Sequence, residues 1–340
     1  TMSTEHFSLY AVQLLSATEI DIDGSQLGNI ANGGTFRLTS DATWSEPIII
    51  TKDTVLDLNG RGVYYQGTGS FLVVQYGATL TIQDSQIEDS QAPKETVTTV
   101  DGDPYGHMAS LSDSTLTYYI TKSTAHGTGT TETLEKHEVP LAGAGKILCE
   151  RPADQVIEVE NGGTLELLSG VLQGADVKHI VYVDGGTLNV SGGYIVGGGS
   201  DDRPGGGIYV NSGAEKGKVN IQGGVVAANR GNFGGGIYVV GGELTISDGA
   251  VTGNTVFNGH DDDGGGIYVN SGTLKLSGNG YVTNNSKSCD CTDCPVDTNN
   301  THGGGGIALA NGSTMEMSGG YVTGNFSSLA GGGIYAGYYA

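Results

Sequence analysis

The sequence has 340 residues, of which 60 are glycine and 7 are proline, and its formal net charge at pH 7 is −22. With 37% hydrophobic residues the chain is too apolar to be disordered, and it lacks the Gly-X-Y period of collagen. The negative charge argues against nucleic acids and anionic membranes as partners, and no apolar stretch approaches the roughly 20 residues of a membrane span.

The first part of the chain contains two regions that do not repeat. Residues 1–40 are predicted to cap the open end of a repeat array. Within them, SQLGNIANGG at 25–34 predicts a short helix that ends at a glycine. Residues 86–150 interrupt the array as a large loop or a small hairpin subdomain. In the second case TLTYYITKS at 115–123 pairs with ETLEKHEVPL at 132–141.

The rest of the chain repeats one sequence motif, which reads GGGIYVNSG at both 205–213 and 264–272. Each copy holds three short pieces rich in Ile, Val, Tyr and Thr, such as IYV, TLKL and YVT, with turn residues between them. The first inward apolar residues of the copies are Leu72, Ile157, Val181, Ile208, Ile237, Ile267, Ile307 and Ile334. Three strands per repeat predict an all-β, right-handed, single-stranded parallel β-helix, whose coils stack at about 4.8 Å.

Alternation along each piece predicts which side chains face the core. In IYV at 267–269, Ile267 and Val269 point inward and Tyr268 points outward. The outward position repeats as an external tyrosine row: Tyr182, Tyr209, Tyr238, Tyr268 and Tyr335, interrupted by Ala308. Such rings can stack on sugar rings while their hydroxyls form hydrogen bonds, which makes the row a candidate ligand-binding surface. The alternative is that the rings only stabilise a flat parallel face.

A second row of identical residues is polar. It consists of Asn229, Asn254, Asn285 and Asn325, each three residues after an inward Val. This regularity predicts an asparagine ladder inside a turn, with side-chain amides bonded along the stack. The histidines at 107, 126, 137 and 179 follow no pattern, and we expect them at the surface.

The connection between the third strand and the next repeat varies in length, so binding is expected on that edge. Two of these connections are acidic, and they hold Asp201 and Asp202, and Asp261, Asp262 and Asp263. Stacking places the two clusters about 10 Å apart, near the upper limit for the carboxylates of an inverting glycosidase. Three interpretations stay open: a solvated turn, calcium bound by residues 261–263, and catalysis by all five aspartates. We expect no cofactor, with calcium at this site as the alternative.

The cysteines are also unevenly placed. Cys289, Cys291 and Cys294 lie in one long connection, as CDCTDC, and Cys149 lies far upstream. Four cysteines in an exported protein allow two disulfides. Three thiolates with His302 could instead bind zinc in tetrahedral geometry, and free thiols are the third alternative.

The repeats resemble a known family. GGGI followed by VTGN, at 251–254 and 322–325, resembles the GGA[ILV]…FxxN repeats of the polymorphic outer membrane proteins, with Val in place of Phe. The run from TVLDLNGRGV to GATLTIQDS, at 54–85, is similar to the opening coils of repetitive surface proteins of Gram-positive gut bacteria. The resemblance covers residues 41–85 and 151–340. It implies a right-handed β-helix of the pectin-lyase-like fold, displayed on a bacterial cell surface as an adhesin or autotransporter passenger.

We therefore expect a cap at 1–40 and a β-helix at 41–340 that the 86–150 insertion interrupts. The expected function is a non-enzymatic, extracellular binding domain of a larger anchored surface protein. It would be monomeric and would present loops and the tyrosine face to a host glycan or host surface protein. Two alternatives remain: a polysaccharide lyase or glycoside hydrolase of the same fold, and a structural spacer.

Overall fold

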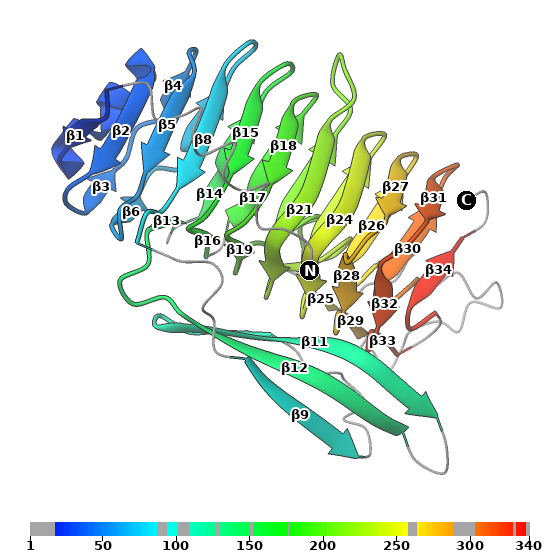
Figure 1. Cartoon of the computed structure of the whole chain (residues 1–340). Coiled ribbons are helices and arrows are strands. Elements are labelled where there is room, and N and C mark those ends of the chain that lie inside the picture. Colours follow the sequence, from blue (N-terminus) through cyan, green and yellow to red (C-terminus); the bar gives the residue numbers. More distant parts are fainter. Residues whose placement is uncertain are drawn as a thin grey trace.

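The computed structural model describes residues 18–86, 94–100, 109–126, 130–149, 152–175, 177–200, 202–257, 264–288, 303–328 and 331–337. Over these ranges β-strands are the main secondary structure, and most strands belong to long parallel sheets that run the length of the molecule (Figure 1). Successive repeats add strands to the same sheets. The predicted all-β, parallel structure is confirmed at this level, and the arrangement is compatible with a parallel β-helix.

Sheet B contains the first piece of each repeat and has nine strands within the described residues. Its register pairs the first apolar residue of one repeat with that of the next, as predicted; Val181 pairs with Ile208, and Ile208 with Ile237. In order along the stack, its strands are β4 (Ile48–Ile50), β7 (Leu72–Val74), β14 (Ala153–Val159), β17 (Val177–Asp184), β20 (Ile208–Asn211), β23 (Ile237–Val240), β26 (Ile267–Asn270), β30 (Ile307–Ala310) and β34 (Ile334–Ala336).

Sheet A contains the second and third pieces in two rows, with seventeen strands in the described part of the chain. The first row runs through β1 (Ile20–Ile22), β2 (Gly34–Leu38), β5 (Thr54–Asp57), β8 (Thr79–Gln83), β15 (Thr164–Leu167), β18 (Thr187–Val190), β21 (Lys218–Ala227), β24 (Glu243–Thr252), β27 (Thr273–Leu276) and β31 (Thr314–Met317). The second row runs through β3 (Ala42–Trp44), β6 (Gly62–Tyr65), β13 (Lys146–Cys149), β16 (Val171–Gly174), β19 (Tyr194–Val196), then β21 and β24 again, β28 (Tyr281–Thr283) and β32 (Tyr321–Thr323). Strands β21 and β24 are long enough to belong to both rows.

The inward sides of these sheets form one apolar core. In a single repeat, Ile267 and Val269 of sheet B face Leu274, Leu276 and Val282 of sheet A, and all five are fully buried. These are the side chains that alternation predicts to point inward. Each contributes about 1.5–3 kcal/mol by leaving water, but only because the neighbouring repeats cover it.

The predicted asparagine ladder is present beside a short corner sheet. Asn229 Nδ2 donates to Asn254 Oδ1 at 3.0 Å, and Asn254 Nδ2 donates to Asn285 Oδ1 at 2.9 Å. Asn285 Nδ2 donates to Asn325 Oδ1 at 3.0 Å. The corner sheet comprises β22 (Arg230–Gly231), β25 (Thr255–Phe257), β29 (Ser286–Ser288) and β33 (Phe326–Ser327).

The ladder explains the last glycine of every GGGI motif except the final one, where that glycine is Gly333. A Cβ added at Gly236 would lie 2.9 Å from Nδ2 of Asn254, closer than real Cβ contacts allow. The same clash with a ladder amide arises at Gly207, Gly266 and Gly306. The glycine run and the asparagine row, which are separate features of the sequence, therefore form one packing unit.

The first end of the stack is covered by the helix η1 (Gly24–Asn32), which ends at Gly33 as predicted. It is a 3-10 helix whose Leu27 and Ile30 are fully buried in the same core as the sheets. Asp23 and Gln26 form a capping box at its start. Within the predicted cap at 1–40, the strands β1 and β2 already belong to sheet A. None of the described helical segments is long and apolar enough to cross a membrane.

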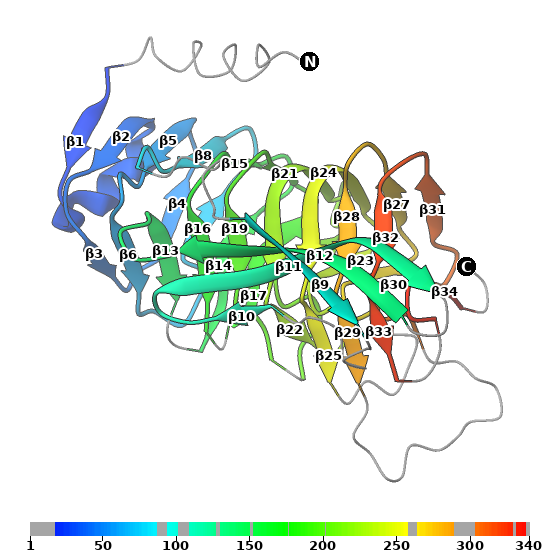
Figure 2. The same cartoon turned by 60° about the horizontal axis from the view of Figure 1, so that its bottom comes forward.

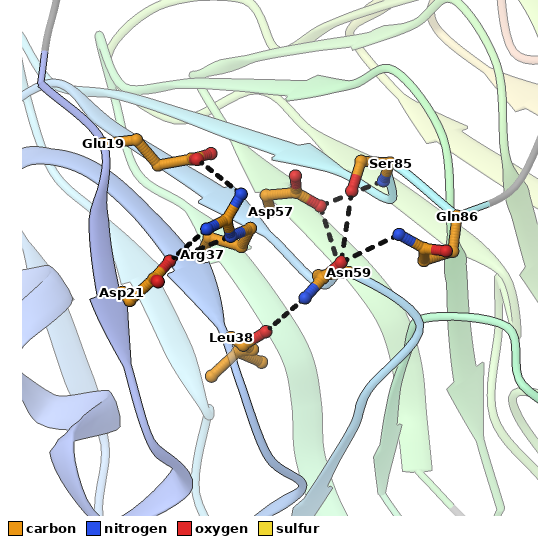
Figure 3. Close-up of polar contacts among 8 residues, drawn as sticks. All are labelled: Glu19, Asp21, Arg37, Leu38, Asp57, Asn59, Ser85 and Gln86. Atoms are coloured by element: carbon orange, nitrogen blue, oxygen red, sulfur yellow. Dashed lines mark hydrogen bonds and ion pairs between the residues drawn. The ribbon is translucent and has the colours of Figure 1, made fainter.

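Polar contacts tie the first repeats together on their outer side (Figure 3). Arg37 forms ion pairs with Glu19 and Asp21 at 3.1 and 2.7 Å. Farther along, the buried carboxylate of Asp57 accepts hydrogen bonds from the backbone N–H groups of Asn59 and Ser85 at 2.8 and 3.0 Å. The second of these bonds joins two consecutive repeats.

The insertion forms an antiparallel sheet of four strands: β9 (Lys94–Val100), β10 (Ser110–Leu111), β11 (Thr115–His126) and β12 (Thr130–Pro140). The two segments predicted to pair do so, in β11 and β12. Figures 1 and 2 show this hairpin running along the stack, across the strands of sheet A rather than parallel to them. The last strand of the predicted insertion, β13, belongs to sheet A.

Candidate binding surface

The outward side of sheet B carries the tyrosine row in the predicted register. Tyr182 pairs with Tyr209, Tyr209 with Tyr238, and Tyr238 with Tyr268. Tyr335 follows after Ala308. A parallel sheet places its strands about 4.8 Å apart, and the ring centroids along the first four members are 5.1–5.4 Å apart.

The ring orientations divide the row into two parts. Tyr238 and Tyr268 stack face to face, and Phe233 stacks against both. Tyr268 is consequently only 5% exposed and departs from the exposed row that the sequence predicts. Tyr182 and Tyr209 are half-buried and tilted by 57°, and Tyr209 meets Tyr238 edge-on. Tyr182, Tyr209 and Tyr238 are therefore the consecutive members of the row that remain half-buried, and Tyr335, beyond Ala308, is half-buried as well.

Amide side chains hold the phenol groups of this row. Asn211 Nδ2 donates to the Tyr182 hydroxyl at 3.2 Å and to Asp184 Oδ1 at 2.9 Å. One repeat further, Asn270 Nδ2 lies 3.5 Å from the Tyr238 hydroxyl. Asn211 and Asn270 close their IYVN strands, at the position that Asp184 occupies in β17. The phenols are thus bordered along the stack by fixed amide and carboxylate groups.

On the neighbouring strand β14, a second polar group continues the surface. Glu158 pairs directly with Tyr182, and its Oε2 accepts hydrogen bonds from Ser70 Oγ at 2.6 Å and from Gln155 Nε2 at 2.9 Å. Gln155 Nε2 also donates to Ser70 Oγ at 2.7 Å. These contacts hold the Glu158 carboxylate in one place beside the first tyrosine of the row.

His179 is part of the same aromatic surface, although we expected it at the surface of the protein. It is 8% exposed, and its ring lies 4.8 Å from that of Tyr209 and 5.9 Å from that of Tyr182. Its Nδ1 lies 3.1 Å from the carbonyl oxygen of Gly205, which can only accept, so Nδ1 carries the proton. Burial lowers the pKa of His179 to about 4, and the charge of Lys178 adds to this effect. His137 is also buried, at 5% exposed.

Burial favours the neutral phenol at two members of the row, Tyr182 and Tyr209. Burial raises the pKa of Tyr209 to about 12, and the neighbouring tyrosines and Asp184 add to the effect. Burial and the charge of Asp184 raise the pKa of Tyr182, while the hydrogen bond from Asn211 opposes this. Neutral phenols both donate and accept hydrogen bonds. The hydroxyl groups of this surface can therefore bind polar groups of a ligand, and its ring faces can stack on sugar rings.

Of the predicted acidic site, the structure describes Asp202. This residue is exposed, and its carboxylate accepts a hydrogen bond from Ser200 Oγ at 2.5 Å, which lowers its pKa. Its other oxygen lies 3.9 Å from Arg203 Nε. Asp201, Asp261, Asp262 and Asp263, with the calcium site assigned to the last three, lie outside the described residues. Within the described ranges, no group of three or more His, Cys, Asp or Glu side chains is placed to hold a metal ion.

Of the four cysteines, the structure describes only Cys149. Cys149 ends β13 and is fully buried in the main core, beside Ile147. Cys289, Cys291 and Cys294, and the zinc ligand His302 considered with them, lie outside the described residues. The choice between a disulfide and a metal site therefore stays a prediction.

Sequence reasoning missed Glu158, Asp184 and His179 as members of the surface. A signal existed for the first two: Glu158 occupies the tyrosine position of the weaker repeat IEVENGG, and Asp184 occupies the Asn position of IYVN. No sequence pattern marks His179, because it lies before the repeated motif. Phe233, in a connection between repeats, was equally unmarked.

Comparisons with known proteins give no match: no family model, curated protein or solved structure is significantly similar to this chain. The resemblance to polymorphic outer membrane proteins and to the pectin-lyase-like fold therefore stays a prediction from the repeats.

Proposed function

We propose that the chain is a right-handed parallel β-helix and a non-enzymatic binding domain of an extracellular surface protein. In this proposal a glycan binds along the outward side of sheet B, across Tyr182, Tyr209 and Tyr238. The repeated motifs and the parallel sheets support the β-helix fold. The repeated motifs and the acidic composition support an extracellular surface location. The row of tyrosines supports the ligand class.

One observation carries the proposal. Tyr182 and Tyr209 are half-buried, on adjacent strands, with ring centroids 5.4 Å apart, a spacing comparable to the length of one pyranose unit. Asn211 fixes both the Tyr182 hydroxyl and the Asp184 carboxylate. Aromatic rings beside fixed hydrogen-bonding groups suit sugars, because each sugar ring has apolar C–H faces and a polar rim. A rigid parallel scaffold holds these groups in place before the ligand arrives, which reduces the cost of ordering them.

The test is to incubate the full chain with a panel of neutral, basic and acidic polysaccharides, with and without calcium. Bound glycan and glycan chain length are followed together. The proposal predicts binding without shortening. Shortened chains would contradict it and would favour the alternative of a polysaccharide lyase or glycoside hydrolase acting through the aspartate connections. The absence of binding to every glycan would also contradict it and would leave a protein ligand or a spacer role.

A further inference from the structure

We infer that the acidic end of this surface, around Tyr182, recognises a protonated amine and so selects glycans that contain amino sugars. The inference rests on the proposed function, because it concerns the ligand class of the same surface. The residues that carry it are Tyr182, Glu158 and Asp184. We call these three residues the acidic tyrosine site.

The first step is the placement of the two carboxylates around one ring. Glu158 pairs with Tyr182 across β14 and β17, so their side chains leave the sheet on the same side. Asp184 is two residues beyond Tyr182 on β17 and, by alternation, points the same way. All three side chains are half-buried. A small cation over the face of this ring would therefore meet two negative groups and the negative side of the ring quadrupole.

The second step is that these carboxylates are held in place but not neutralised. Glu158 accepts from Ser70 and Gln155, and Asp184 accepts from Asn211. All these donors are uncharged. Within the described residues, the ion pairs found do not involve Glu158 or Asp184. The two carboxylates thus retain their negative charge for a ligand.

A nearby lysine shows the contrast. Lys178, earlier on β17, forms an ion pair with Asp154 of β14, so this pair is balanced within the protein. Lys178 lies four positions before Tyr182 on β17, whereas Asp184 lies at the other end of this strand. The surface therefore has a neutral end near His179 and an acidic end near Asp184.

A protonated amine fits the chemistry of these three side chains. Ammonium groups bind the faces of tyrosine rings through the ring quadrupole, and carboxylates add charge-assisted hydrogen bonds. Burial, Asp184 and Glu158 each raise the pKa of Tyr182, as expected where negative potential accumulates. Uronic acid chains, by contrast, would meet like charge at Glu158 and Asp184, as well as the net charge of −22.

The experiment measures the affinity of the full chain for three probes at mildly acidic pH. The probes are a β-1,4-linked glucosamine oligomer, its fully N-acetylated counterpart and an oligogalacturonate. The inference predicts that the amine form binds at least tenfold more tightly than the acetylated form, and that oligogalacturonate binds most weakly. The double variant Glu158→Gln, Asp184→Asn is expected to remove the preference for the amine and to retain binding of the acetylated form. Each carboxamide keeps an oxygen that can accept the existing hydrogen bonds.

A matched control separates the site from the overall charge. Asp113 and Glu316 are exposed and lie outside sheet B, so the double variant Asp113→Asn, Glu316→Gln removes the same net charge elsewhere. It is expected to keep the amine preference. Equal loss in both double variants would overturn the inference, because the preference would then come from net charge alone.

The failures of the two proposals are distinguishable. Equal affinity for the amine and acetylated forms, unaffected by Glu158→Gln and Asp184→Asn, would overturn the amine inference and leave the glycan-binding function standing. No binding of any of the three probes would overturn the amine inference. If the wider glycan panel is also negative, the proposed function fails with it.

Discussion

Asn254 illustrates how one side chain can join three successive repeats. Its Oδ1 accepts from the backbone N–H and from Nδ2 of Asn229, at 3.1 and 3.0 Å. Its Nδ2 donates to Val226 O and to Asn285 Oδ1, both at 2.9 Å. The residue is fully buried, so water cannot replace these bonds when they are lost.

The ladder gives a first prediction. Asn254→Ala removes all four hydrogen bonds and leaves several buried partners unsatisfied, so it should lower the free energy of unfolding by about 3 kcal/mol. The measurement is urea unfolding followed by circular dichroism. Asn279→Ala is the matched control, because Asn279 is exposed, and it should cost less than about 0.5 kcal/mol. Equal urea midpoints for the two variants would show that the ladder does not stabilise the stack.

The buried His179 should make the stability of the protein depend on pH. Its pKa is about 4 in the folded protein, because burial disfavours the charged form, and near 6.5 when unfolded. A folded-state pKa that is lower than the unfolded one gives stability that is fully present above pH 6.5 and is lost as the pH falls toward 4. The size of this effect is roughly 3 kcal/mol.

The measurement compares the free energy of unfolding of the wild type and of His179→Gln at pH 7 and at pH 4. The wild type should lose roughly 3 kcal/mol more than the variant over this interval, because glutamine cannot be protonated. An identical pH dependence in both proteins would mean that His179 stays exposed enough to titrate normally.

At the scale of single residues, the sequence was informative where the chain repeats. The ladder, the inward side chains and the tyrosine register follow from period-two alternation and from identical spacing, and all three are present in the structure. His179 and Phe233 were not predictable, because neither occupies a repeated position. Their burial depends on packing against side chains from other repeats, for which a single sequence has no marker.

The hairpin β11–β12 is the element that most changes the outer surface of sheet A. Its Leu116 and Tyr118 pack against Tyr194, Val225 and Ala250 in a second apolar cluster. Side chains of sheet A also form hydrogen bonds with backbone carbonyl groups of β11. Thr252 and Thr323 donate to the carbonyl oxygens of Tyr119 and Thr121, at 2.6 and 2.8 Å. The hairpin is therefore docked across several repeats through both apolar packing and hydrogen bonds.

This docking gives an element-scale prediction. Leu116 is fully buried, and Leu116→Ala should weaken the docked hairpin by about 3 kcal/mol. Hydrogen exchange followed by mass spectrometry should then show faster exchange in β11 and β12, with sheet B unchanged. Leu111→Ala, at the half-buried rim of the same cluster, should have a smaller effect. Uniformly faster exchange over the whole chain would mean that hairpin and sheets unfold as one unit.

The pairing of the hairpin was predictable, but its position was not. Two Thr-, Tyr- and Ile-rich segments separated by a short polar connection predict a hairpin on local grounds. The docking face is marked only indirectly, by the apolar residues Val225, Ala227 and Ala250 at outward positions of the third strands, where a solvated sheet would carry polar residues. Alternation alone does not say which segment covers them.

At the scale of the whole molecule, the two ends of the stack differ. The first end is covered by η1. At the other end, Ile334 is 42% exposed, although Ile307 and Ile267, its partners along the stack, are fully buried. Between the ends, the hairpin packs on the outer surface of sheet A, and the tyrosine row lies on sheet B. Asp201, Asp261, Asp262, Asp263 and the cysteine-rich connection lie outside the described residues, so the hypotheses about them stay predictions.

In the proposed function, the outward side of sheet B binds glycan without cleaving it. The most direct measurement is the affinity of the wild type and of Tyr209→Ala for the tightest glycan of the panel, by titration calorimetry. Tyr321→Ala is the matched control, since Tyr321 is an exposed tyrosine of β32 in sheet A. We expect at least a tenfold loss of affinity for Tyr209→Ala, unchanged affinity for Tyr321→Ala, and intact glycan recovered from every sample. Unchanged affinity in Tyr209→Ala, in a variant that is still folded, would place the binding site elsewhere and rule out the proposed glycan surface.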